Sequence, residues 1–145
     1  MDQFMRAALD EAKRGGAQGG IPIGAVLVNE GRIVARGHNR RIQDSAPVMH
    51  GEINCLYNAG KTVDSFQGMA IYSTLMPCHM CAGAIIQFGI TRVYAGESET
   101  FDEGRRMLER HGIEVVDMDL DEAKQLMRDF IAANPSQWNQ DIGKE

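Results

Sequence analysis

Four side chains in two short motifs are of the kinds that bind a metal ion and move a proton. His50 and Glu52 stand two residues apart. Further along the chain, Cys78 and Cys81 form a C-x-x-C motif preceded by Pro77. One imidazole and two thiolates make a three-ligand set for zinc, and a catalytic zinc site leaves its fourth position to water, whereas a structural site is normally closed by four protein ligands. The pattern therefore predicts one catalytic zinc ion per chain.

The spacing of these residues predicts how the backbone must present them. Cys78 and Cys81 are three residues apart, so they share one face at the start of a helix. The partial positive charge at that helix N-terminus lowers the pKa of both thiols towards the metal-binding thiolate. His50 and Glu52 would point to roughly opposite sides of a regular helix. We therefore expect His50 in extended conformation just outside a helix and Glu52 in its first turn, so that both face the metal.

Glu52 is predicted to carry protons rather than to bind the metal. A carboxylate beside zinc-bound water can take its proton and return it to a substrate, because zinc lowers the pKa of that water towards 7. The alternatives are a structural zinc or a redox dithiol at the cysteines, and a helix-start carboxylate at Glu52. H-x-E followed by P-C-x-x-C is the signature of zinc-dependent nucleobase deaminases. The combined pattern predicts hydrolysis of an exocyclic amine.

Hydrophobic periodicity predicts the elements that position these motifs. Apolar residues at helical spacing predict helices at 2–14, 52–59, 79–88, 102–111 and 120–133. Apolar, β-branched runs predict strands at 21–28, 32–36, 69–75, 91–96 and 113–118, the first two forming a hairpin. Gly15-Gly16 is expected to end the first helix, and 37–49 to form a polar loop. Because the later strands alternate with helices, we expect an α/β fold with helices on both faces of a partly parallel sheet.

Length and composition indicate one domain, 1–145, of an ordinary globular protein. The chain has 145 residues, 43% of them hydrophobic, and a net charge of -5. Dedicated nucleic-acid binders often have a domain pI above about 9, so the acidic balance argues against a nucleic-acid partner. Apolar stretches fall short of the roughly 18 residues that a membrane span needs, and the N-terminus lacks the apolar centre of a signal peptide. We expect a cytoplasmic protein with no membrane partner, in which C-x-x-C is a metal or redox motif.

Several longer segments resemble one known family. They are GGIPIGAVLV, GRIVARGHNR, HGEI, STLMPCHMCAGAIIQFGITRVYAGE and FIAANPSQWNQDIG, which together span about residues 19–143. The chain resembles the cytidine deaminase superfamily and is most similar to its fungal-type cytosine deaminases, which act on the free base. The resemblance implies a three-layer α/β/α sandwich with a mixed five-stranded sheet, and a homodimer. It also implies a set of substrate-binding residues, namely Asn39, Gly51, Phe101, Trp138 and Asp141, the last two in a C-terminal lid formed by 134–145.

The leading hypothesis is a free-base deaminase that converts cytosine to uracil and ammonia. A tRNA adenosine deaminase is an alternative, because HNRRIQDSAPVM resembles that pattern equally. Other small cyclic amidines are also possible substrates, among them guanine, isocytosine and creatinine-like compounds. A non-catalytic zinc scaffold would have no use for Glu52. We expect Cys55 to be a packed core residue, and His38, His79 and His111 to be surface or loop histidines.

Overall fold

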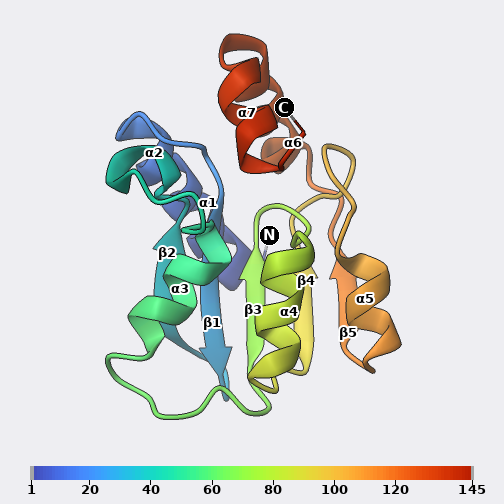
Figure 1. The fold of residues 1–145 in the computed structure, drawn as a ribbon. Coiled ribbons are helices and arrows are strands. Elements are labelled where there is room, and N and C mark those ends of the chain that lie inside the picture. The colour runs from blue at the N-terminus through green and yellow to red at the C-terminus, as the bar shows by residue number, and fades with distance from the viewer. Residues whose placement is uncertain (1, 145) are drawn as a thin grey trace.

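The computed structural model describes residues 2–144 and places a five-stranded sheet between two layers of helices (Figure 1). The strands are β1 (Gly24–Asn29), β2 (Arg32–His38), β3 (Ala70–Ser73), β4 (Arg92–Ala95) and β5 (Glu114–Asp117). The helices are α1 (Gln3–Ala17), α2 (Arg41–Asp44), α3 (Gly51–Ala59), α4 (His79–Gln87), α5 (Arg105–Arg110), α6 (Asp121–Ala133) and α7 (Pro135–Asp141). Residues 1 and 145, the two ends of the predicted domain, lie outside the described residues.

The sheet is mixed, as the sequence predicted. Its strand order is β2-β1-β3-β4-β5. β1 pairs antiparallel with both β2 and β3, whereas β3, β4 and β5 run parallel to one another. The parallel pairs are joined through α4 and α5, which is the crossover that such pairs require. The predicted α/β class and the mixed five-stranded sheet are confirmed.

Alternating side chains on the strands build the two cores. On β1, Ala25 and Leu27 face one layer, and Val26 and Val28 face the other. The first pair packs in a cluster with residues of α3, α4 and α5, and the second pair packs with residues of α1 and α6. Figure 1 shows α3 and α4 side by side in front of the sheet, with α1 behind it. The buried period of two along the strand therefore fixes which helices cover which face.

The hairpin between β1 and β2 forms at the predicted place. Glu30 and Gly31 both have positive φ angles, 50° and 76°. Positive φ at both central residues is the geometry of the two-residue turns that suit twisted antiparallel strands. The following strand extends to His38, two residues beyond the predicted end.

Several expectations about element boundaries were wrong. The strand predicted at 21–28 begins only at Gly24, and the one predicted at 69–75 ends at Ser73. α1 continues through Gly15-Gly16 to Ala17. Gly15 does not end the helix but allows close packing, since a Cβ there would lie 2.9 Å from the His38 ring. The helix predicted from residue 102 begins only at Arg105, since Gly104 before it packs against the carbonyl oxygen of Pro77. The loop predicted at 37–49 contains α2.

A further helix, α7, lies after residue 133, where the sequence predicted none. Pro135 occupies its first turn, a position that proline favours because the missing N–H has no helical partner there. Among residues 2–144, no helix has the length and apolar character of a membrane span.

Candidate active site

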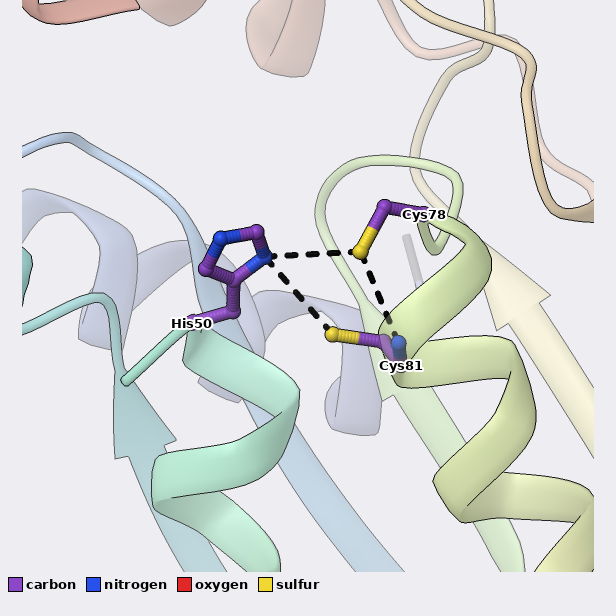
Figure 2. Close-up of side chains that lie close together, drawn as sticks. All are labelled: His50, Cys78 and Cys81. Carbon is purple, nitrogen blue, oxygen red and sulfur yellow. Dashed lines mark hydrogen bonds between the residues drawn. The ribbon is translucent and has the colours of Figure 1, made fainter. Parts of the chain in front are cut away.

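The N-terminal ends of α3 and α4 bring the two sequence motifs together. His50 immediately precedes α3 in extended conformation, with φ -64° and ψ 164°, and Glu52 lies in the first turn of that helix. Cys78 immediately precedes α4 in extended conformation, and the backbone N–H of Cys81 points to its sulfur at 3.5 Å. These backbone arrangements confirm what the two spacings predicted. Figure 2 shows the imidazole and both sulfurs converging from the two helix ends.

The converging atoms have the spacing of a zinc site. Nδ1 of His50 lies 3.5 Å from Sγ of Cys78 and 3.8 Å from Sγ of Cys81 (Figure 2). The three candidate ligand atoms all lie within 4.8 Å of one another. Tetrahedral zinc with ordinary Zn–N and Zn–S bond lengths separates a nitrogen and a sulfur ligand by roughly 3.6 Å. The residues present therefore fit zinc, with three protein ligands.

The charges of the donor set also suit a cation. A hydrogen bond from Cys81, together with His50, lowers the pKa of Cys78 to about 4 against the opposing effect of burial. The neighbouring Cys78 sulfur and burial raise the pKa of Cys81 well above its usual range. Burial lowers the pKa of His50, but Asp141 and Cys78 outweigh it and raise that pKa to about 10. Two sulfurs that resist carrying two negative charges at once are stabilised as thiolates by a bound cation.

Glu52 lies beside this centre without belonging to it. Its side chain is buried and lines the adjacent cavity, and it is not one of the three clustered ligand residues. Burial, helped by Cys78, raises the pKa of Glu52 to about 7, with His50 acting in the opposite direction. A carboxyl group whose pKa lies near neutrality can both accept and return a proton at physiological pH. Glu52 therefore lies on the cavity wall beside the ligand residues, and its role as proton carrier stays a prediction.

The cavity beside Glu52 is small, with a volume of about 20 Å³. Its apolar wall comes from Ile23, Leu75, Met76, Phe101, Trp138 and Ile142. Phe101 and Trp138 meet edge to face, with ring centroids 6.0 Å apart and an interplanar angle of 83°. This is a favoured geometry for aromatic pairs, and it closes one side of the cavity.

Asp141, on α7, lines the cavity and also contacts His50. Its Oδ1 lies 3.3 Å from Nε2 of His50, the ring nitrogen that faces away from the cysteines. Its Oδ2 accepts a hydrogen bond from Nδ2 of Asn39 at 3.2 Å. A carboxylate on the second nitrogen of a metal-binding histidine fixes the orientation of the ring. The sequence predicted Asp141 only as a substrate contact, and the pairing with His50 had no local signal.

Asn39 and Gly51 do not line the cavity. The amide of Asn39 is fully buried, and its Oδ1 accepts the backbone N–H of Arg41 at 2.9 Å. Gly51 is the first residue of α3, and a Cβ there would lie 3.1 Å from the carbonyl oxygen of Ile23. Of the five predicted substrate-binding residues, the structure brings Phe101, Trp138 and Asp141 to the cavity. Substrate contacts by all five stay predictions.

The predicted positions of His79, His111 and Cys55 are confirmed, whereas that of His38 is wrong. His38 is buried, with Nδ1 2.9 Å from Glu11 Oε2, so the prediction of a surface or loop position was wrong. The cause is the extra turn of α1, which covers the end of β2. His79 and His111 are exposed. Cys55 is fully buried in the core, as predicted, and its thiol points to the carbonyl oxygen of Ala35.

Fold and site together define a zinc-dependent hydrolytic deaminase. The chain belongs to the cytidine and deoxycytidylate deaminase family, because the model of that family's zinc-binding region matches residues 1–97. Cytosine deaminase of Candida albicans is 40% identical over 142 residues, which cover 97% of this chain and 95% of that protein. A tRNA-specific adenosine deaminase of Bacillus subtilis is 39% identical over 95 residues, which cover 64% of this chain and 59% of that protein.

Solved structures agree with this assignment. A structure from a study of tRNA:A34 deaminases superimposes with a TM-score of 0.70 and 34% identity, covering 79% of this chain and 95% of the other. Guanine deaminase from Nitrosomonas europaea superimposes with a TM-score of 0.77 and 26% identity, covering 89% of this chain and 83% of the other. Relatives of this fold and site therefore deaminate different rings.

Proposed function

We propose that this enzyme deaminates a free pyrimidine base, with cytosine to uracil and ammonia as the leading reaction. The observation that carries the proposal is the small cavity beside Glu52, closed by Trp138, Asp141 and Ile142 at its α7 side. The similarity to the Candida cytosine deaminase covers 97% of this chain, enough to include α7. The match to the Bacillus tRNA-specific enzyme covers 64%. A pocket walled in this way suits a single ring better than a nucleotide within RNA.

The chain's own residues supply the proton transfers. Zinc held by His50, Cys78 and Cys81 would supply Lewis acidity, which makes water a nucleophile at neutral pH. As water adds to C4 of cytosine, Glu52 accepts its proton and passes it to the adjacent ring nitrogen. Glu52 then takes the second proton of that water and delivers it to the amine as the C4–N bond breaks. Ammonia leaves and uracil remains, and Glu52 returns to its starting state.

In our proposal, α7 is the lid of the cavity and forms the wall that admits the free base but not its nucleoside. The predicted lid is 134–145, of which residue 145 lies outside the described residues. Trp138 and Ile142 cover the cavity, and Asp141 offers it a carboxylate. In free cytosine N1 carries a hydrogen that this carboxylate can accept, whereas in cytidine N1 carries ribose. The same wall would then collide with the sugar.

The comparison that tests this function is cytosine against cytidine under identical conditions. We expect a clearly higher kcat/KM for cytosine, because only the free base fits against α7 with its N1–H bonded. Ammonia release is the measurement, with guanine, isocytosine, creatinine and a tRNA anticodon stem-loop as further substrates. Equal or faster turnover of cytidine would overturn the free-base proposal, and turnover of the stem-loop alone would favour the tRNA-editing alternative.

Replacing Asp141 by Ala is expected to lower kcat/KM for cytosine at least about tenfold, because it removes a charged hydrogen-bond partner. The same change should weaken zinc binding by about 10–100-fold, since His50 loses the carboxylate behind its ring. Kinetics and competition with a zinc chelator measure the two effects separately. Asn139→Ala, on the exposed side of α7, is the matched control and should change neither. Unaltered kinetics and zinc affinity in Asp141→Ala would remove both roles.

We also propose that the enzyme is a homodimer joined through the layer formed by α3 and α4. Large apolar side chains are exposed on these helices or directly after them, namely Tyr57 at 61% on α3, Met80 at 39% on α4, and Phe88 at 49% just after α4. Exposed apolar groups on one layer indicate an interaction site. Light scattering should give twice the 16.0 kDa mass of the chain. Tyr57→Glu should shift it towards one chain, whereas Gln3→Glu, which adds the same charge on α1, should not. A monomeric wild-type enzyme would contradict the proposal.

The expected setting is pyrimidine salvage in the cytoplasm. Uracil formed from a free base can re-enter nucleotide synthesis. All three cysteines, Cys55, Cys78 and Cys81, are free thiols. Thiols that must remain available as zinc ligands suit a reducing compartment.

A further inference from the structure

Glu97 is a buried carboxyl group that the proposed chemistry does not use. It follows β4 and is 0% exposed, yet it is not part of the cavity wall. One oxygen, Oε2, accepts the backbone N–H of Thr100 at 2.8 Å. The other, Oε1, has no hydrogen-bond partner among residues 2–144. A buried acceptor without a partner is destabilising, so the fold retains this side chain at a cost in stability.

The contacts of Glu97 reach two segments that line the cavity. Its backbone carbonyl accepts the N–H of Met76 at 2.9 Å, and Met76 lines the cavity. Its side chain accepts the backbone N–H of Thr100, and the next residue, Phe101, also lines the cavity. Glu97 is thus bonded to the backbone of Met76, which lines the cavity, and to the backbone of Thr100, the residue before Phe101.

The other polar contacts of this loop are nearer the surface. Glu99 pairs with Lys124 at 3.1 Å, but its side chain is 67% exposed. Ser98 hydrogen-bonds to the partly exposed Asp117. Exposed ion pairs contribute little to stability, about 0–1 kcal/mol. Of these contacts, the bond between Glu97 and Thr100 is the one made by a fully buried side chain.

We propose that Glu97 is a positioning residue: by holding the Thr100 N–H it fixes Phe101 edge-on to Trp138 and so sets the affinity for the base. This rests on the function proposed above. Phe101 packs against the base in the ground state and the transition state alike. Loss of such a contact raises KM and leaves kcat nearly unchanged.

Glu97→Met tests this in the intact enzyme, because methionine fills similar space without an acceptor. We expect KM for cytosine to rise about tenfold with kcat near wild type. Glu97→Gln keeps an acceptor for Thr100 and should restore KM. Glu99→Gln, in the same loop, should have no effect. In a Phe101→Ala background, Glu97→Met should add little further change in KM, because Glu97 acts through Phe101. An equal rise in both backgrounds would overturn the proposal.

Trp138 gives a second readout that needs no substrate. It is the only tryptophan in the chain, and Phe101 packs against it. Acrylamide should quench its fluorescence more strongly in Glu97→Met than in wild type, and the Glu97→Gln and Glu99→Gln variants should match wild type. If Glu97→Met does not fold, Glu97→Asp withdraws the carboxyl from Thr100 by one methylene and should give the same result. Wild-type quenching in the folded variant would contradict the proposal, whereas failure to turn over cytosine would contradict only the proposed function.

Discussion

Glu52→Gln is expected to lower kcat by about 10²–10⁴-fold, the usual contribution of a general acid–base group. Glutamine keeps the size and shape of the side chain in its buried position, but it cannot accept the proton of water and pass it on. The expected loss follows from the position of Glu52 on the cavity wall and from its pKa of about 7. The effect should fall on kcat, because the proton transfers belong to the chemical steps.

Zinc content separates this prediction from a structural explanation. Glu52 is not among the clustered ligand residues, so Glu52→Gln should retain about one zinc per chain, measured on the purified protein. Glu11→Gln is the matched control, since Glu11 is also a buried carboxyl but pairs with His38, away from the cavity. It should lower stability rather than kcat. Zinc loss in Glu52→Gln would make Glu52 a ligand, and unchanged turnover would exclude it from the mechanism.

The metal centre could be predicted because its geometry follows from local spacing. A two-residue separation of His50 and Glu52 forces one of them out of the helix, and the structure has His50 outside it. The three-residue separation of Cys78 and Cys81 puts both at one helix end. The hairpin was predictable for the same reason, since Asn29-Glu30-Gly31 supplies its own turn chemistry.

The contacts that support the centre are long-range, and local pattern cannot reveal them. Asp141 reaches His50 only because α7 folds back over the cavity, and the resemblance had placed Asp141 towards the substrate. Asn39 is bonded to Asp141 for the same reason. The burial of His38 depends on a helix that continues past two glycines, against their ordinary preference. In each case tertiary packing decides an outcome that propensity and spacing leave open.

Substitution of a zinc ligand is expected to have the other large effect on activity. Cys78→Ala is expected to lose most of the bound zinc and with it nearly all turnover, because two ligands remain where the site needs three. Cys81→Ala should behave in the same way, since its sulfur lies 3.8 Å from the same His50 nitrogen. Metal analysis after dialysis measures the loss of zinc, and an assay of ammonia release measures the loss of turnover.

Cys55→Ala is the matched control for these variants. Cys55 is as deeply buried as Cys81 and is also a free thiol, but its sulfur points to the carbonyl oxygen of Ala35 in the core. Its loss should lower stability while zinc content and turnover stay near wild type. If Cys78→Ala kept a full zinc equivalent and full activity, the ligand assignment would be wrong. Equal zinc loss in Cys55→Ala would mean that loss of core packing, and not removal of a ligand, releases the metal.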